Sequence, residues 1–191
     1  MRNLGLFAGF IPLIIYGILA GQSARSVEVA LVVSLIAEVA FCYHDLVNRF
    51  ILAWATLFMF SFALIGIGAF NVTLFIPYMG ILIYLTLVSV SFGSIIFGTP
   101  FTLQYARRMV DKSLREHPLF RNVNVFMTAV WGVVFLINLA VSGVALVLPG
   151  YAMVCQILTW IFLICGVVFT VIYPGYIRKK VSGSPDPGRR S

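Results

Sequence analysis

Long apolar runs alternate with short polar breaks along the whole chain, and this pattern predicts its elements. A membrane-spanning helix needs about 20 apolar residues, and most of the runs reach that length. The bilayer offers the backbone no hydrogen-bond partner, so each span must be helical; strands are excluded because period-two alternation is absent. The pattern predicts a single all-α domain over residues 1–181, a polytopic transmembrane bundle of six spans at residues 4–20, 27–46, 50–70, 74–97, 125–148 and 151–173.

One break is long enough to hold an element of its own. Residues 99–117 read TPFTLQYARRMVDKSLREH, with apolar side chains at helical spacing and basic ones elsewhere around the axis. Thr99 fits an N-cap, Pro100 fits the first helical position, and Pro118 fits a stop. These features predict an amphipathic helix in the membrane interface.

This predicted surface helix has two possible roles. It is a connector carrying the charge that any cytoplasmic loop carries, which the charge alone favours, or it is a docking surface for anionic lipid or a partner protein. The residues that would make the contact are Tyr105, Arg107, Arg108, Lys112 and Arg115.

The composition agrees with a membrane protein and excludes several other classes. Apolar residues make up 61% of the chain and charged residues 10%, against roughly 25% in an average soluble domain. The mean hydropathy is +1.05. A soluble globular domain, a disordered chain and a disulfide-stapled secreted module are excluded. The three cysteines lie inside apolar runs without a C-x-x-C pair, so neither a disulfide framework nor a metal site is expected; they are Cys42, Cys155 and Cys165.

The basic residues orient the chain. Its net charge is +7, and with six spans twelve of the 13 Lys and Arg residues fall on one side, leaving only Arg25 on the other. The positive-inside rule puts both termini in the cytoplasm. Charge in short loops between apolar runs indicates contact with membrane lipids, anionic ones included, rather than with nucleic acid. Residues 178–180 after the last span fit a headgroup anchor, and residues 182–191 are expected to be disordered.

The first run has an alternative interpretation as a cleaved secretory signal, because Arg2 precedes it and small residues follow it. Cleavage would leave five spans and an external N-terminus with the same charge pattern, so charge cannot decide. The length of the run and Pro12 at its middle favour a retained helix.

Polar residues inside the spans are the candidate sites, because charge in hydrocarbon is costly. Glu38 lies near the middle of the second span, and Ser34, Cys42 and Asp45 share its helix face by spacing. Two interpretations of Glu38 stay open: a carboxyl buried between helices, or a proton or cation site facing a water-filled crevice. Asn138 and Gln156 in later spans are possible hydrogen-bond partners of Glu38, although sequence alone cannot pair them. Asp45 lies near a span end, where water is expected to reach it.

The sequence contains no catalytic constellation. It lacks a P-loop, a G-x-G-x-x-G after a strand, H-E-x-x-H and G-x-S-x-G. Its two histidines, His44 and His117, each sit beside an acid near a predicted membrane surface and fit solvated loop residues. We therefore expect a non-enzymatic protein without cofactor.

Four segments and the basic residues after the last span together resemble a known family. Residues 10–16 (FIPLIIY) are similar to an F-L-P-L-x-x-F opening of the family's first helix, and residues 99–105 hold a short Pro motif. Residues 118–124 are similar to the pattern P-x-W-x-x-L-N, with Phe120 in place of its Trp. Residues 129–135 are similar to the A-W-A-x-F run that follows it. The family is that of intracellular septation protein A, which spans the bacterial inner membrane. The resemblance implies an inner-membrane protein linked to envelope maintenance and septation, and it supplies no catalytic residue.

The function expected from the sequence is a non-enzymatic role in the cell envelope through contacts with other membrane proteins. The alternative is a small ion- or proton-coupled transporter or channel subunit that uses Glu38.

Overall fold

The computed structural model describes residues 5–21, 23–70, 75–110, 115 and 117–182, and this part of the chain is helical without strands. The all-α fold expected from the sequence is confirmed. Five helices are long and apolar enough to cross a membrane, which identifies an integral membrane protein. They are α3 (Ala24–Val47), α4 (Ile51–Leu64, continued by the π-turn η1 at Ile65–Ala69), α5 (Phe75–Ile96), α8 (Pro118–Val147) and α9 (Ala152–Ser182).

The first apolar run differs from the single helix expected at residues 4–20. It forms two short helices, α1 (Gly5–Ala8) and α2 (Ile11–Leu19). The physical reason is Pro12, which lacks the N–H that would bond to the carbonyl of Ala8 in a continuous helix. Neither piece has the length of the other five apolar helices.

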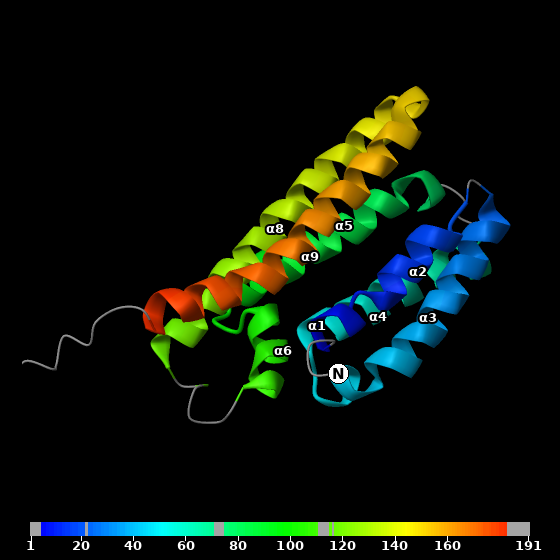
Figure 1. Cartoon of the computed structure of the whole chain (residues 1–191). Helices are drawn as coiled ribbons and strands as arrows, with labels where there is room; N and C mark the ends of the chain where they lie inside the picture. The colour runs from blue at the N-terminus through cyan, green and yellow to red at the C-terminus, as the bar shows by residue number, and fades with distance from the viewer. Residues whose placement is uncertain (1–4, 22, 71–74, 111–114, 116, 183–191) are drawn as a thin grey trace, which may run out of the picture.

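The helices form two groups that lie side by side (Figure 1). One group contains α2, α3 and α4, and the other contains α5, α8 and α9. Contacts between α4 and α5 join the groups, and α8 packs most extensively on α5. The short helix α6 (Phe101–Met109) lies across one end, against α8, α5 and α1. We call this the α6 end; the α3–α4 turn, the start of α8 and the end of α9 lie there as well.

The structure corrects the predicted boundaries around α6. The helix begins one residue after Pro100, because the Ser94 hydroxyl accepts the Phe101 N–H at 3.1 Å, and it ends at Met109 instead of His117. Residues 111–114 and 116 are outside the described part. Pro118 opens α8, seven residues before the expected start of that span, and the ring nitrogen Nδ1 of His117 accepts the Leu119 N–H at 3.2 Å. His117 is exposed and lies outside the helices, as expected of a solvated loop residue, and it also caps α8.

The last helix is longer than predicted. Helix α9 passes the expected end of the sixth span at Tyr173, contains Pro174 and continues to Ser182. The rest of the predicted disordered tail, residues 183–191, lies outside the described part of the chain.

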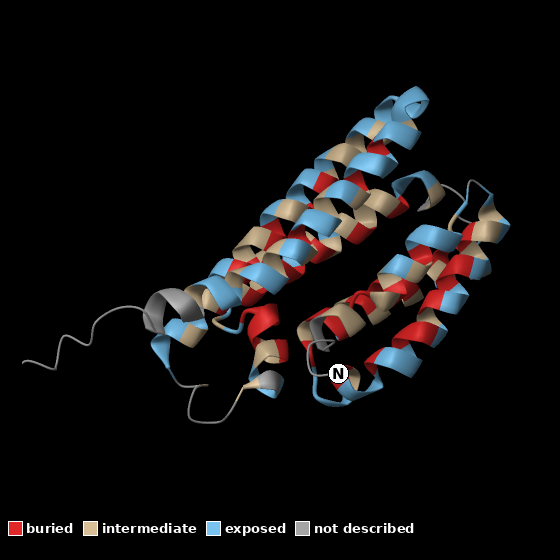
Figure 2. Ribbon diagram, in the orientation of Figure 1, coloured by how far each residue is buried: buried red, intermediate tan, exposed pale blue. Residues whose placement is uncertain are grey.

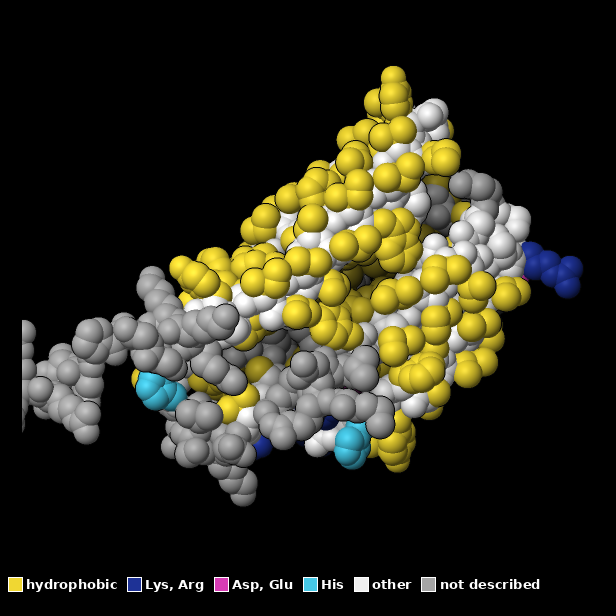
Figure 3. Space-filling view, viewed as in Figure 1, with side chains coloured by type: hydrophobic (Ala, Val, Ile, Leu, Met, Phe, Trp, Pro, Cys, Tyr) yellow, Lys and Arg dark blue, Asp and Glu magenta, His cyan; other side chains and the backbone are white. Residues whose placement is uncertain are grey.

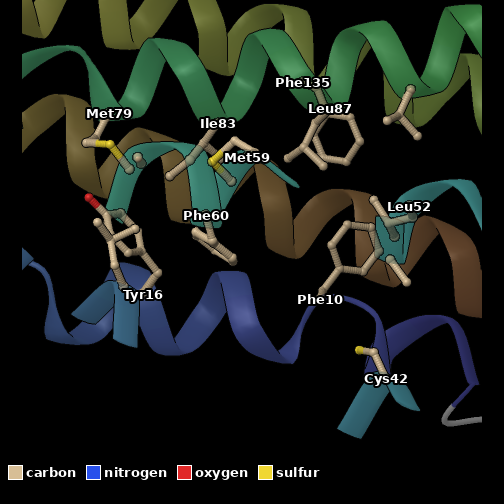
Figure 4. Packing of buried hydrophobic residues seen from close by; sticks show 14 of the residues in the cluster. Phe10, Tyr16, Cys42, Leu52, Met59, Phe60, Met79, Ile83, Leu87 and Phe135 are labelled. Atoms are coloured by element: carbon tan, nitrogen blue, oxygen red, sulfur yellow. The ribbon is translucent and has the colours of Figure 1, made fainter. Parts of the chain in front are cut away.

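The burial pattern is that of a bundle whose outer surface is apolar. Buried residues line the facing sides of the helices, and the outward sides are exposed yet rich in hydrophobic side chains (Figures 2 and 3). Such a surface suits lipid rather than water. Inside, the ring centroids of Phe10 and Trp131 lie 5.0 Å apart and connect the two groups. Within the first group, the rings of Tyr16 on α2 and Phe60 on α4 lie 5.7 Å apart between centroids (Figure 4).

Candidate functional site

A stripe of polar side chains runs along the buried face of α3. It consists of Ser34, Glu38, Cys42 and Asp45, and we call it the polar stripe. All four side chains are buried, whereas neighbouring residues such as Ile36, Val39 and Phe41 face outward. Helical spacing therefore places one continuous polar track inside the bundle, starting at the α6 end with Asp45 and reaching the middle of the membrane at Glu38 and Ser34.

The break in the first apolar run lies against this stripe. Pro12 has no N–H, so it cannot bond to the Ala8 carbonyl as a helical residue would. The thiol of Cys42 donates to that carbonyl instead, at a sulfur–oxygen distance of 3.5 Å. Cys42 lies below Phe10, close to the ribbon of the broken run (Figure 4). An interrupted helix thus exposes backbone to a buried polar face, a feature of ion-binding membrane proteins.

Glu38 has no exposed surface, and neither of its carboxyl oxygens has a hydrogen-bond partner among the described residues. Its polar neighbours are Cys42 and Thr56 of α4. Both are engaged elsewhere, since the Thr56 hydroxyl donates to the carbonyl of its own helix at Leu52, 3.0 Å away. A buried carboxyl without hydrogen bonds is energetically costly, and such a group within a span is a candidate functional site.

Helix α6 closes the α6 end of the polar stripe. The guanidinium of Arg108 makes an ion pair with the buried carboxylate of Asp45. It also donates to the His44 carbonyl at 3.2 Å and lies 3.9 Å from the centre of the Phe50 ring. Asp45, expected to meet water at a span end, is 4% exposed, because α6 folds back over it. Arg108, whose side chain is one-third exposed, therefore pairs with a residue of its own chain in addition to any lipid or partner contact.

Tyr105 is also placed differently from the expectation of a lipid or partner contact. Its side chain is buried, with its ring edge-on to Phe50 at 4.8 Å between centroids. A Cβ built on Gly9 would lie 2.7 Å from its hydroxyl oxygen, so the glycine permits this close approach. Burial, together with the nearby charge of Asp45, raises the pKa of the Tyr105 hydroxyl above its ordinary value. The phenol therefore stays neutral beside the polar stripe.

Two further side chains hold α6 in the bundle. The Gln104 amide oxygen accepts the N–H of Ile51, the first residue of α4, at 3.0 Å. The Thr102 hydroxyl donates to the Asn124 carbonyl of α8 at 2.9 Å, so its 2.7 Å bond with Thr128 is donated by Thr128. These two polar side chains thus connect α6 to α4 and α8.

The remaining basic candidates have separate places. Arg107 is exposed on α6. Arg115 is half-buried, and its Nε donates to the Val110 carbonyl at 2.9 Å. Lys112 lies outside the described residues. Among the described residues of the predicted contact surface, Arg107 is exposed and its side chain makes no hydrogen bond or ion pair with another described residue.

Asn138 and Gln156 are not hydrogen-bonded to Glu38. Asn138 is buried on α8, and neither polar atom of its amide has a partner among the described residues. Gln156 is exposed on α9, where it lines a cavity between the two helix groups. Asn138 and Gln156 lie on α8 and α9 in one helix group, whereas Glu38 lies on α3 in the other group. The sequence does not show how the two groups pack, so it could not pair these residues.

The site also contains members that sequence reasoning missed: the Ala8 carbonyl, Thr56 and the Asp45–Arg108 pair. Pro12 was the available signal for the first, because a proline within a helical run leaves the carbonyl four residues earlier without its helical N–H partner. Within the described residues, no group of three or more His, Cys, Asp or Glu side chains is arranged to hold a metal ion. The arrangement can bind or release a proton at the buried carboxyl of Glu38. The neutral phenol of Tyr105 and the Asp45–Arg108 ion pair lie between this carboxyl and the α6 end.

Comparison with known proteins gives no match: no family model, no curated protein and no solved structure is similar to this chain.

Proposed function

We propose that this chain is a small proton-coupled transporter or channel subunit of the bacterial inner membrane, with Glu38 as the group that takes up and releases the proton. The observation that carries this proposal is the Glu38 carboxyl, fully buried and without a hydrogen-bond partner among the described residues. Ionisable groups within spans are costly and typically mark ion or proton pathways. The broken helix beside Cys42, one helical turn from Glu38, adds support, because interrupted helices line the ion sites of transporters.

The polar residues near Glu38 lead toward one side of the membrane only, which suits a group that exchanges protons in turn with two compartments. Between Glu38 and the α6 end the buried face of α3 carries Cys42 and Asp45. On the other side of Ser34 the same face carries Leu31, Ala30 and Val27, each at most 2% exposed. A proton would therefore reach Glu38 from the α6 end, once the Asp45–Arg108 pair that closes this end opens.

The charge distribution supports an orientation with the α6 end in the cytoplasm. Among side chains that the structure describes, Arg25 lies at the opposite end, and the remaining arginines lie at or near the α6 end: Arg49, Arg107, Arg108, Arg115 and Arg121. By the positive-inside rule this end is cytoplasmic. We count the broken α1–α2 run as the sixth crossing, which puts both termini in the cytoplasm.

A proton fits the site better than a metal cation. Hard cations such as Ca²⁺ and Mg²⁺ take six or more oxygen ligands. Zinc takes four ligands from among nitrogen, sulfur and oxygen atoms. Around Glu38 the polar groups are the Cys42 thiol and the Thr56 hydroxyl, which donate to backbone carbonyls, and the Ser34 hydroxyl one turn along the same face, too few for such a ligand set. A single carboxyl is sufficient for proton transfer.

The test is proton flux in proteoliposomes that contain the purified full chain and a trapped pH-sensitive dye. Flux driven by a pH gradient should fall to that of empty vesicles in Glu38→Gln, which keeps the size and hydrogen-bonding capacity of the side chain. Glu28→Gln, at the half-buried start of the same helix, is the matched control and should retain flux. Equal flux for wild type, Glu38→Gln and empty vesicles would reject the proposal.

A second candidate is the non-enzymatic envelope role implied by the likeness to the septation protein A family. Exposed Arg107 on α6 favours it, because its cationic side chain faces outward at the α6 end, where an anionic lipid or a partner protein could bind. A photo-crosslinking residue at position 107 in cells should then capture a membrane partner, and deletion should alter cell shape or division. Normal division with a solute-sensitivity phenotype would favour transport instead.

A further inference from the structure

A cavity of about 400 Å³ lies between the two helix groups, bounded by α2 on one side and by α5, α8 and α9 on the other. Figure 3 shows a hollow between the groups on the face that is drawn. Its volume falls within the range of small-molecule sites. Every residue that lines it is uncharged, and Glu38 is not among them. The cavity is thus separate from the polar stripe and independent of the proposed proton transfer.

The polar groups of this cavity gather at the end away from α6. Tyr16 lies three residues before the end of α2 at Leu19, and Gln156 lies four residues after the start of α9 at Ala152. With a helical rise of 1.5 Å per residue, both are within about 6 Å of their helix ends. Ser142 and Thr159 line the same region. Hydroxyl and amide groups therefore occupy the depth of the headgroups and upper acyl chains of one leaflet.

The inner end of the cavity is aromatic. Phe10 stacks on Trp131 with centroids 5.0 Å apart, and Phe135 lies 6.1 Å from Phe10. Trp131 is thirteen residues along α8 from Pro118, about 20 Å by helical rise, which places it near the middle of the membrane. The indole N–H is already bonded to the Thr170 hydroxyl at 2.9 Å. This end thus presents ring faces suited to hydrocarbon.

We propose that the cavity binds one lipid chain with an uncharged, hydroxyl- or carbonyl-bearing head, drawn from the leaflet away from α6. The polar end would hydrogen-bond the head, and the aromatic end would hold the tail. The Tyr16 hydroxyl points toward α5 beside Met79 (Figure 4), into the space where such a head would lie. An ionised head would be desolvated without a pairing charge, which is unfavourable.

The first experiment is photo-crosslinking of the full chain in phosphatidylcholine nanodiscs with a monoacylglycerol that carries a diazirine near the end of its chain. Mass spectrometry should locate the label on α8 and α9 near Trp131 and Leu163. Excess monoolein should suppress the labelling, and oleate at a pH where it is ionised should suppress it far less. Label spread over the outer helix faces without competition would overturn the site, and equal competition by oleate would overturn the uncharged head.

Two variants distinguish lipid bound in the cavity from lipid that only contacts the outer helix faces. Leu163→Trp adds bulk to the lining and should abolish the competed label, whereas Ile161→Trp on the outward face of α9 is the matched control and should keep it. Combining Gln156→Leu with Thr159→Val removes hydrogen-bonding groups at similar volume and should weaken monoolein competition roughly fivefold. Elution as a single species in detergent and an unchanged melting temperature establish folding. Unchanged competition in a folded Leu163→Trp protein would reject the proposal.

Discussion

Arg108 of α6 is ion-paired with Asp45, a buried residue near the end of α3 that lies 63 positions earlier in the chain. The same guanidinium donates to the His44 carbonyl and lies over the Phe50 ring. One side chain therefore ties α6 to the α3–α4 turn and covers the end of the polar stripe. Breaking this pair should change both the stability of the protein and the accessibility of the stripe.

Arg108→Gln should destabilise the protein by about 1.5–3 kcal/mol, because it leaves the Asp45 carboxylate buried without its charged partner. Arg107→Gln on the exposed side of α6 is the control and should change stability by less than about 0.5 kcal/mol. Unfolding in mixed micelles with increasing dodecyl sulfate measures the free energy. If Arg108→Gln were as stable as Arg107→Gln, the pair would make no net contribution. Adding Asp45→Asn to Arg108→Gln should recover part of the loss.

Arg108→Gln should also open the stripe to reagents. Cys42 is fully buried beside Glu38, so its thiol reports on access from the α6 end. In a chain with Cys155→Ser and Cys165→Ser, we expect N-ethylmaleimide to label Cys42 slowly in the parent and faster in Arg108→Gln. The Arg107→Gln variant should match the parent. Equal rates in all three would show that the ion pair does not limit access.

Gly9→Ala should destabilise the protein by about 1–3 kcal/mol, because the added Cβ would lie 2.7 Å from the Tyr105 hydroxyl oxygen. Tyr105→Phe removes that oxygen and keeps the ring. On its own it should be neutral or slightly stabilising, because the buried hydroxyl has no hydrogen-bond partner among the described residues. Thermal unfolding of the two single variants and the double variant tests this. Tyr105→Phe should rescue most of the loss from Gly9→Ala, and simple additivity would contradict the close contact.

Thr170→Val should weaken the packing of α8 on α9 by about 1 kcal/mol, because the indole N–H of Trp131 loses its acceptor at 2.9 Å within the membrane. The control is Thr86→Val on α5, whose hydroxyl bonds only to the Leu82 carbonyl of its own helix among described residues. A lower melting temperature for Thr170→Val than for Thr86→Val is expected. Equal melting temperatures would mean that the Trp131 bond contributes nothing.

The predicted face of α3 shows how far sequence spacing reaches. Ser34, Glu38, Cys42 and Asp45 share a face through helical geometry alone, and the structure buries all four. Spacing could not say what covers that face. The covering residues, Thr56, Tyr105 and Arg108, come from two other helices, and their proximity depends on how those helices pack.

The amphipathic segment at residues 99–117 shows where the local pattern was insufficient. Its pattern separated apolar from basic positions, which suggested a helix lying on the membrane surface with Arg108 and Tyr105 exposed to partners. In the folded chain the charge of Asp45 and the turn before Phe50 offer Arg108 a stronger local partner than water does. Local pattern cannot distinguish a face that meets lipid from a face that meets another helix, because both are apolar.

The sequence by itself determined that this protein is helical and built for a membrane, since runs of about 20 apolar residues have no other stable form in hydrocarbon. It also located Glu38 as the costly group within a span. The tertiary structure alone decided that the first run is broken beside Cys42, that α6 closes over Asp45, and that a cavity separates α2 from α9. These features depend on contacts between segments distant in the chain, and the hydrophobic pattern, which is local, carries no record of them.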